Sequence, residues 1–159
     1  MEFLKRKIHA ISINSKKIKK DGIFIAIKGL NFDGHDFINE AFKNGAIAAI
    51  ISDEEKNSSK TILVNNTKKA LADISSLILK KFNPFVIGIT GSNGKTTTKE
   101  LIKSILDLNY GQNQIIATRG NYNNDIGLPL TIFNLNSEHS HIVLEMGMNH
   151  ANEISYLAN

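Results

Sequence analysis

Cysteine is absent from this chain of 159 residues, and only two prolines occur, at positions 84 and 129. Without cysteine there are no disulfides, thiol nucleophiles or thiolate metal ligands, a composition that fits a reducing cytosol. No apolar run approaches the roughly 20 residues that span a bilayer. The N-terminal segment MEFLKRKIHAIS also lacks the continuous apolar stretch of a secretory signal. We therefore expect a cytoplasmic protein with no membrane insertion.

A strong charge of either sign is also lacking, since the formal net charge is only +4. Hydrophobic residues make up 42% of the chain and charged residues 21%, which is typical of a globular protein and argues against disorder. The lysines are scattered, apart from a tight group at positions 16, 17, 19 and 20 without interleaved aromatics. This group is better explained as a solvated turn than as a nucleic-acid patch, so no nucleic-acid partner is expected.

The most informative segment that is present runs from Val86 to Thr98, with the sequence VIGITGSNGKTTT. The apolar run Phe85–Ile89 predicts a buried strand, and glycines at 91 and 94 allow the backbone to turn its N–H groups around an anion. Lys95 and Thr96 add a cation and a hydroxyl at the start of a helix, where the unpaired N–H groups also favour phosphate. Strand, glycine turn, Lys-Thr and helix together predict a nucleoside triphosphate site. The apolar stripe expected for this helix is Leu101, Ile102, Ile105 and Leu106.

One position departs from the usual phosphate-loop pattern. The form G-x-x-x-x-G-K-[ST] would place a glycine at position 89, where this chain has isoleucine. A glycine-rich turn with a chance Lys-Thr is the alternative explanation, and the strand–helix context argues against it.

The first half of the chain predicts a small α/β unit over residues 1–83. Apolar runs bounded by turn residues predict strands at 8–13, 23–27, 46–51 and 61–64. Helical periodicity predicts helices at 35–44 and 67–82. Asn83-Pro84 ends the second helix, so we place the domain boundary there and assign 84–159 to a second unit.

The second unit predicts strands at 85–89, 114–117 and 141–144, with helices after the phosphate loop and within 126–135. Strands that alternate with helices indicate a mostly parallel sheet with crossovers. The expected fold class is therefore α/β: a small N-terminal domain, then a truncated phosphate-loop domain with only about three strands of its sheet.

Glu145 follows the apolar strand 141–144, at the sheet edge where α/β proteins bind ligands. Near Lys95 and Thr96, this carboxylate is well placed to hold Mg²⁺, which prefers one or two carboxylates plus phosphate oxygens and water. A strand-terminal glutamate in solvent is the alternative. His150 could be a ligand or proton carrier, and it could equally be only an exposed histidine.

Two further segments are candidates for binding. The run 118–124, TRGNYNN, is dense in side chains that both donate and accept hydrogen bonds, although an asparagine-rich loop without a role would look the same. Asp33-Gly34-His35 is either a binding turn or simply a turn that leads into a helix.

Taken together, these segments resemble the Mur ligase family. The matching segments, in the family's order over nearly the whole chain, are 14–16, 22–29, 32–37, 45–46, 90–97, 118–129 and 145–150. The asparagine-rich segment followed by Ile-Gly-x-Pro favours the member that joins D-Ala-D-Ala to UDP-N-acetylmuramoyl-tripeptide. The resemblance therefore favours a functional 118–124 segment over a chance asparagine-rich loop.

The resemblance implies a role for each segment. The uridine nucleotide of the substrate would contact Ser15, Asp33, Gly34 and His35 in the first half. ATP phosphates would be cradled by Gly91, Ser92, Asn93, Gly94, Lys95, Thr96 and Thr97. Thr96 and Glu145 would bind Mg²⁺, and Lys95, Glu145 and His150 would act in catalysis. The sugar–peptide side of the cleft would be lined by Thr118, Asn121, Asn123, Asn124 and His150.

The implied reaction moves the γ-phosphoryl group of ATP onto the peptide carboxylate, and the dipeptide amine then attacks the acyl phosphate. Such chemistry depends mainly on positioning and charge neutralisation. Asn14-Ser15-Lys16 departs from the family's usual Asp-Ser-Arg. Family members also continue through the rest of the ATP domain and a third domain, so we expect the front portion of a ligase that is inactive alone. Truncation and gene splitting are both open explanations, and under the second the remainder is carried by a second polypeptide. A non-catalytic nucleotide-binding remnant is the alternative; an unrelated phosphate-loop kinase or GTPase lacks its further motifs here.

Overall fold

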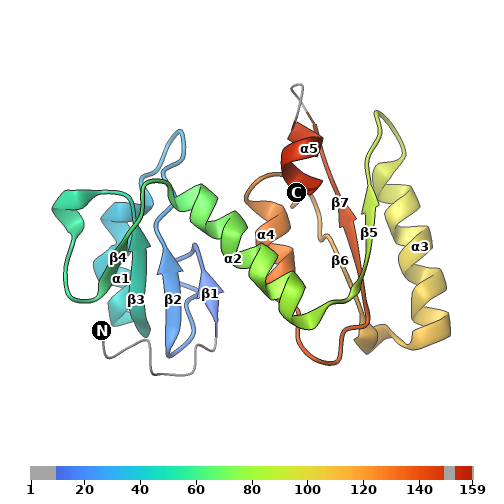
Figure 1. Cartoon of the computed structure of the whole chain (residues 1–159), viewed down its shortest axis with the longest axis horizontal. Helices are drawn as coiled ribbons and strands as arrows, with labels where there is room; N and C mark the ends of the chain where they lie inside the picture. The colour runs from blue at the N-terminus through green and yellow to red at the C-terminus, as the bar shows by residue number, and fades with distance from the viewer. Residues whose placement is uncertain (1–9, 149–152, 159) are drawn as a thin grey trace. The chain divides into compact units, whose positions relative to one another are not determined.

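A computed structural model describes residues 10–148 and 153–158 of the chain (Figure 1). Its contacts divide it into two compact units, Met1–Leu71 and Ala72–Asn159. This division falls inside a helix, twelve residues before the boundary expected at 83/84, so the domain limits drawn from the sequence stay a prediction. No helix among the described residues has the length and apolar character needed to cross a membrane.

The first unit contains a four-stranded parallel sheet in the order β1-β2-β3-β4 (Figure 1). Its strands are β1 (Ile11–Ser12), β2 (Gly22–Ile25), β3 (Ala46–Ile51) and β4 (Thr61–Leu63). The predicted helix at 35–44 is a 3-10 turn, η2 (Gly34–Phe37), followed by α1 (Ile38–Lys43). A second 3-10 turn, η3 (Glu54–Lys56), precedes β4, and α2 (Thr67–Phe82) follows it.

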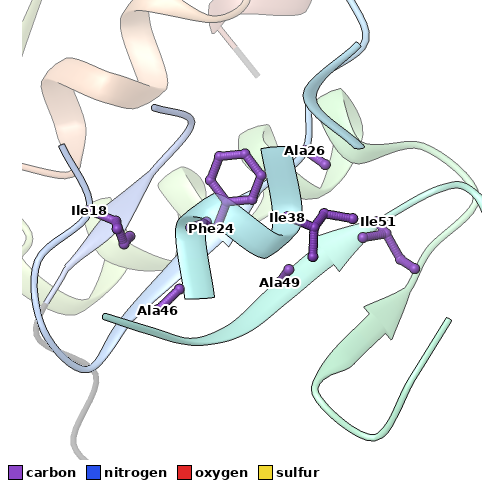
Figure 2. Close-up of a cluster of buried hydrophobic side chains, with 8 residues drawn as sticks. Ile18, Phe24, Ala26, Ile38, Ala46, Ala49 and Ile51 are labelled. Atoms are coloured by element: carbon purple, nitrogen blue, oxygen red, sulfur yellow. The ribbon is translucent and has the colours of Figure 1, made fainter. Parts of the chain in front are cut away.

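The core of this unit forms where α1 packs on β2 and β3 (Figure 2). Alternate residues of a strand share one face, so Phe24 and Ala26 of β2 and its continuation join Ala49 and Ile51 of β3 on this side. The small alanines leave room for Ile38 of α1. The neighbouring Ile25 and Ile50, on the opposite face, are also buried, as expected for a parallel sheet.

The second unit contains a three-stranded parallel sheet in the order β5-β7-β6. Its strands are β5 (Phe85–Ile89), β6 (Ile115–Ala117) and β7 (His141–Glu145). Helix α3 (Lys95–Tyr110) and a 3-10 turn, η4 (Gln112–Gln114), lead from β5 to β6. Helix α4 (Gly127–Ile132) leads from β6 to β7, and α5 (Glu153–Ala158) follows β7. The mixed α/β class with parallel sheets confirms the fold expected from the sequence.

Helices cover both faces of this sheet (Figure 1). Val143 of β7 faces Ile102 and Leu106 of α3, whereas Ile142 and Leu144 face the other side. The cluster on that other side is completed by Leu128, Ile132 and Leu135 from α4 and the turn after it, by Ile78, Leu79 and Phe82 from α2, and by Ile116, Met146 and Leu157.

Two details of the expected burial are wrong. The strand β5 was expected to be buried, but Phe85 is 66% exposed and Val86 is 47% exposed. The reason is that β5 pairs with β7 alone among the described residues and so forms an edge. In α3, Leu101 and Ile105 are also exposed, because only the face that carries Ile102 and Leu106 meets the sheet.

Register brings the ends of the three strands together. Ile89, the last residue of β5, pairs with Glu145, the last residue of β7, and Ala117 of β6 pairs with Val143. Because all three strands are parallel, the residues that follow β5 and β6 lie at the same sheet edge as Glu145. The phosphate-loop candidate and the 118–124 segment thus start at one edge.

Candidate functional site

The loop after β5 has the backbone that a phosphate-binding turn requires. Gly91 has φ of 148° and Gly94 has φ of 75°, both in the region that side chains disfavour. Gly94 precedes α3, which begins at Lys95. The first helical N–H groups therefore face the loop, where they favour an anion.

The isoleucine at position 89 has a structural explanation. Its side chain is buried with Ile115, Ala117 and Val143 on the α3 side of the sheet. The strand therefore continues through this position, and the glycine turn starts only after it. A glycine at 89 would remove part of the core that fixes α3 against the sheet.

Lys95 folds back over its own loop. Its Nζ donates a hydrogen bond of 2.6 Å to the carbonyl oxygen of Gly91. Gly91, Ser92, Asn93, Gly94 and Thr97 are all exposed. The ammonium group and the loop backbone thus lie within reach of one another on an accessible surface.

Glu145 is the buried acid of this site. Only 3% of the residue is exposed, and both carboxylate oxygens accept hydrogen bonds. Thr96 Oγ1 donates to Oε2 at 2.9 Å, and Asn123 Nδ2 donates to Oε1 at 3.2 Å. The prediction that Glu145 and Thr96 lie together is thus met in the geometry, and the alternative of a solvated glutamate is wrong.

Thr118 connects the end of β6 to this acid. Its hydroxyl accepts a hydrogen bond of 2.9 Å from the backbone N–H of Glu145, and only 2% of the residue is exposed. Its carbonyl oxygen accepts a hydrogen bond of 2.8 Å from Lys99 Nζ. The Thr118 side chain is therefore buried, and it holds the backbone of Glu145 rather than facing solvent.

Lys99 is a buried cation that the sequence reasoning missed. It is 2% exposed, its Nζ lies 4.0 Å from Glu145 Oε2, and it also pairs with Glu100 Oε1 at 2.9 Å. A signal was available, because Lys99 stands three residues before Ile102 and seven before Leu106, on the stripe of α3 that packs on the sheet. A charged residue in that stripe marks a buried polar contact.

The oxygen atoms gathered here fit Mg²⁺ better than a transition metal. Among the described residues no group of three or more His, Cys, Asp or Glu side chains could hold a metal ion. One carboxylate and one hydroxyl instead converge within 2.9 Å of each other beside the loop. Mg²⁺ suits such a site, because it keeps waters and takes the rest of its ligands from phosphates.

The asparagines of the 118–124 segment differ in their surroundings. Asn123 packs tightly on the backbone after β7, since a Cβ at Gly147 would meet its side-chain amide at 3.0–3.2 Å. Asn124 Oδ1 accepts hydrogen bonds from the N–H groups of Ile126 and Gly127, at 3.2 and 2.8 Å, and so supports the start of α4. Asn121 is exposed. The substrate contacts predicted for this segment stay predictions.

A cavity of about 520 Å³ lies beside β6 and is lined in part by this segment. Arg119 and Tyr122 line it, together with His139 and Glu138 near the start of β7. Neither the phosphate loop nor Glu145 contributes to its lining. The cavity lining therefore does not overlap the candidate phosphate site.

In the first unit, Ser15 is buried. Its hydroxyl donates to Glu40 Oε2 at 2.5 Å, and its carbonyl oxygen accepts a hydrogen bond from Asn44 Nδ2 at 2.9 Å. These bonds join the lysine-rich turn to α1. While it donates to Glu40, the hydroxyl oxygen keeps lone pairs that could accept a hydrogen bond from a ligand, but it could not also donate one.

The Asp33-Gly34-His35 turn is held together internally. Asp33 Oδ1 accepts hydrogen bonds from the backbone N–H of His35 at 3.0 Å and from its Nδ1 at 2.5 Å, and Nε2 accepts one from the Ser52 N–H at 2.9 Å. The pKa of the Asp33 carboxyl lies below its ordinary value, first because of the backbone hydrogen bond from His35. Gly34 is required here, since a Cβ would lie 2.6 Å from the backbone nitrogen of Ile27.

His35 is 4% exposed with both ring nitrogens engaged, so the imidazole supports the turn. The uridine contacts predicted for Ser15, Asp33, Gly34 and His35 are not tested by this geometry. His150 lies outside the described residues, and its predicted role stays a prediction as well.

Comparison with known proteins places this site in a family. The Mur ligase family catalytic domain matches residues 7–83, and the Mur ligase middle domain matches residues 89–159. The chain belongs to the Mur ligase family. In sequence, the two matched ranges are separated only by residues 84–88, and the second range includes the candidate phosphate loop, Glu145 and the 118–124 segment.

Similar Mur ligases include the UDP-N-acetylmuramoyl-tripeptide–D-alanyl-D-alanine ligases of Buchnera aphidicola and Haemophilus influenzae. The Buchnera protein is 45% identical over 151 residues, which cover 94% of this chain and 32% of the relative. The Haemophilus protein is 37% identical over 152 residues, which cover 94% of this chain and 33% of the relative. The chain thus spans about a third of the length of these relatives.

Solved structures of Mur ligases share the fold of this chain. The MurF ligase of Thermotoga maritima in complex with ADP is 38% identical, with a TM-score of 0.84 over 99% of this chain and 36% of that protein. MurF of Acinetobacter baumannii is 35% identical, with a TM-score of 0.86 over 96% of this chain and 33% of that protein.

Proposed function

We propose that this chain forms the uridine-nucleotide and ATP-phosphate sites of an ATP-dependent ligase of peptidoglycan synthesis. The proposed reaction joins D-Ala-D-Ala to UDP-N-acetylmuramoyl-tripeptide in the cytoplasm. The observation that carries the proposal is the convergence of Lys95, Thr96 and Glu145 at one sheet edge, in a chain whose relatives catalyse that reaction.

The proposed roles follow from charge and geometry. Lys95 exchanges the Gly91 carbonyl for the β- and γ-phosphates of ATP, and the loop N–H groups from Gly91 to Thr97 bind the remaining phosphate oxygens. Thr96 and Glu145 hold Mg²⁺, which neutralises charge on the phosphates when it is bound. The buried position of Glu145 keeps bulk water away from that contact.

The remaining candidate residues are assigned to the substrate in the proposal. Asn121, Asn123, Asn124 and His150 face the sugar–peptide portion, and Thr118 holds the start of their segment. The uridine portion binds the first unit near Ser15 and the Asp33-Gly34-His35 turn. The γ-phosphoryl group then passes to the peptide carboxylate, and the amine of D-Ala-D-Ala displaces it as phosphate.

Nucleotide binding without turnover is the alternative function. The described residues supply a single carboxylate at the phosphate site, Glu145, and so one metal position rather than two. In that case a second polypeptide with the remaining two-thirds of the ligase would be needed for chemistry.

Calorimetric titration with Mg²⁺–ATP tests the phosphate site. Lys95→Ala should weaken binding about ten- to a hundredfold, because a charge-assisted contact contributes roughly 1.5–3 kcal/mol. Lys80→Ala, on an exposed turn of α2, is the matched control and should bind as the unaltered chain does. Equal affinities for the Lys95→Ala variant and the unaltered chain would refute the phosphate-loop assignment.

NMR titration with UDP tests the first unit. Addition of UDP or UDP-N-acetylmuramic acid to the full chain should shift amide signals near Ser15 and His35. The phosphate-loop amides should respond to ATP in a separate titration. Shifts from UDP that are confined to residues beyond 84 would contradict this division of roles.

A further inference from the structure

Lys99 is the one buried ammonium group among the described residues, and no role described above uses it. A lysine side chain loses much of its hydration when it is buried, and this desolvation opposes folding unless partners replace the water. The same stripe of α3 places Ile102 and Leu106 against the sheet. An apolar residue at position 99 would satisfy that packing without any desolvation of charge.

The partners of Lys99 explain its position. Its Nζ donates a hydrogen bond of 2.8 Å to the Thr118 carbonyl, forms an ion pair with Glu100 Oε1 at 2.9 Å, and lies 4.0 Å from Glu145 Oε2. Glu100 is exposed, with 61% of its side chain in solvent, so this contact is the least constrained. The two buried partners stand at the ends of β6 and β7.

One buried partner, Glu145, is itself assigned to the metal, and the other, Thr118, is hydrogen-bonded to its backbone. Glu145 Oε2, the atom nearest to Lys99, is the one that accepts the Thr96 hydroxyl. Thr118, whose carbonyl Lys99 holds, receives the Glu145 backbone N–H on its hydroxyl. The ammonium therefore fixes this carboxylate from two directions, through its charge and through the strand end beside it.

We propose that Lys99 is a positioning residue of the nucleotide site: it holds the Glu145 carboxylate toward Thr96 before the metal–nucleotide complex binds. This inference rests on the proposed function. Lys99 does not contact the phosphates, because it lies one helical turn beyond Lys95 and is 2% exposed. It raises metal affinity by removing the need to order the acid on binding.

The test measures how much Mg²⁺ strengthens binding of a non-hydrolysable ATP analogue. Calorimetry with Mg²⁺ and with EDTA gives two affinities, and their ratio reports the metal contribution. Lys99→Met should lower this ratio about 10–100-fold, as is typical when the support of a metal ligand is removed. Its affinity in EDTA should not change, since the Lys95 loop is intact.

Two controls separate positioning from general stability. Glu100→Gln removes the exposed ion pair and should leave the ratio unchanged. Lys99→Met combined with Glu145→Gln should lower the ratio no further than Glu145→Gln alone, because Lys99 acts through Glu145. A Lys99→Met ratio equal to or above that of the unaltered chain would overturn the inference, as would full additivity of the two substitutions.

Failure of the unaltered chain to bind the analogue would count against the proposed function and not against the contacts of Lys99. Amide hydrogen exchange, measured without nucleotide, then tests the positioning role directly. The Thr118 N–H donates to the Val143 carbonyl, and the Glu145 N–H donates to Thr118 Oγ1. Both amides should exchange about tenfold faster or more in Lys99→Met. Amides of α4 in the same unit, such as that of Phe133, which bonds to the Pro129 carbonyl, should keep their rates and show that this unit is folded. Unchanged exchange at Thr118 and Glu145 would overturn the positioning role.

Discussion

At the scale of single residues, hydrogen bonds to polar atoms hold several side chains in one position. Asp33 is an example, since its carboxylate accepts both the backbone N–H and the ring Nδ1 of His35. These bonds favour the ionised form, which is why the pKa of Asp33 lies below its ordinary value. Stability that depends on the carboxylate is therefore fully present above the pKa of the unfolded chain, about 3.9, and is lost as the pH falls through the lower pKa of the folded state.

Asp33→Ala should lower the free energy of unfolding at pH 7 by about 1–3 kcal/mol, because the buried His35 Nδ1 loses its partner and the turn loses its cap. The difference from the unaltered chain should shrink below about pH 4, where the Asp33 carboxylate becomes protonated. Urea unfolding at pH 7 and at pH 3 measures both effects. Asp33→Asn, which keeps an oxygen acceptor without the charge, should cost less; a pH-independent difference for Asp33→Ala would contradict the argument.

At the scale of elements, only one face of α3 is buried against the sheet. Ile102 and Leu106 face Val143, whereas Leu101, Ile105 and Leu108 are 61%, 59% and 87% exposed. These three lie four and three residues apart and form one stripe on the open face. A continuous apolar stripe of this kind favours association with another surface.

We therefore expect the isolated chain to self-associate as its concentration rises. Ile105→Glu with Leu108→Glu should reduce this association without loss of stability, since neither side chain is in the core. Sedimentation velocity over a range of concentrations measures the first effect, and urea unfolding the second. Ile102→Glu, on the buried face, is the contrasting variant and should unfold the second unit. Identical sedimentation of the double variant and the unaltered chain would exclude this stripe as the cause.

For the whole molecule, the relevant fact is that the chain corresponds to about a third of its relatives. In-line phosphoryl transfer requires a clamped nucleotide and neutralisation of charge on both oxygens. The described site offers Lys95, Thr96 and Glu145 for this purpose. We expect that set to bind a nucleotide and not to complete the transfer.

The chain alone, given ATP, Mg²⁺, UDP-N-acetylmuramoyl-tripeptide and D-Ala-D-Ala, should release no phosphate above background. Addition of a polypeptide with the remaining two-thirds of a related ligase should restore release. A coupled phosphate assay measures both, with Lys95→Ala as the control that should stay inactive in the mixture. Substrate-dependent turnover by the lone chain would mean that these residues form a complete catalytic site.

The sequence by itself determined the local structure. Apolar runs between turn residues fixed β3 at Ala46–Ile51 and β5 at Phe85–Ile89, and helical periodicity fixed α2 at Thr67–Phe82. The glycine spacing before Lys95 and the family motifs predict a phosphate loop, and the acid that ends β7 was recognisable from the apolar run before it. Such features depend on near neighbours in the chain, so a single sequence reports them.

The tertiary structure alone decided which of these residues meet and which faces are covered. Parallel pairing in the order β5-β7-β6 brings Thr96, Thr118 and Glu145 together, although up to 49 residues separate them in sequence. Among the described residues the same order leaves β5 at an edge, so the apolar Phe85 and Val86 are exposed. It also surrounds Lys99 with the ends of β6 and β7, and a lysine that would be solvated on an isolated helix becomes a buried support for the acid. Contacts of this kind depend on strand order and register, which no local pattern of residues encodes.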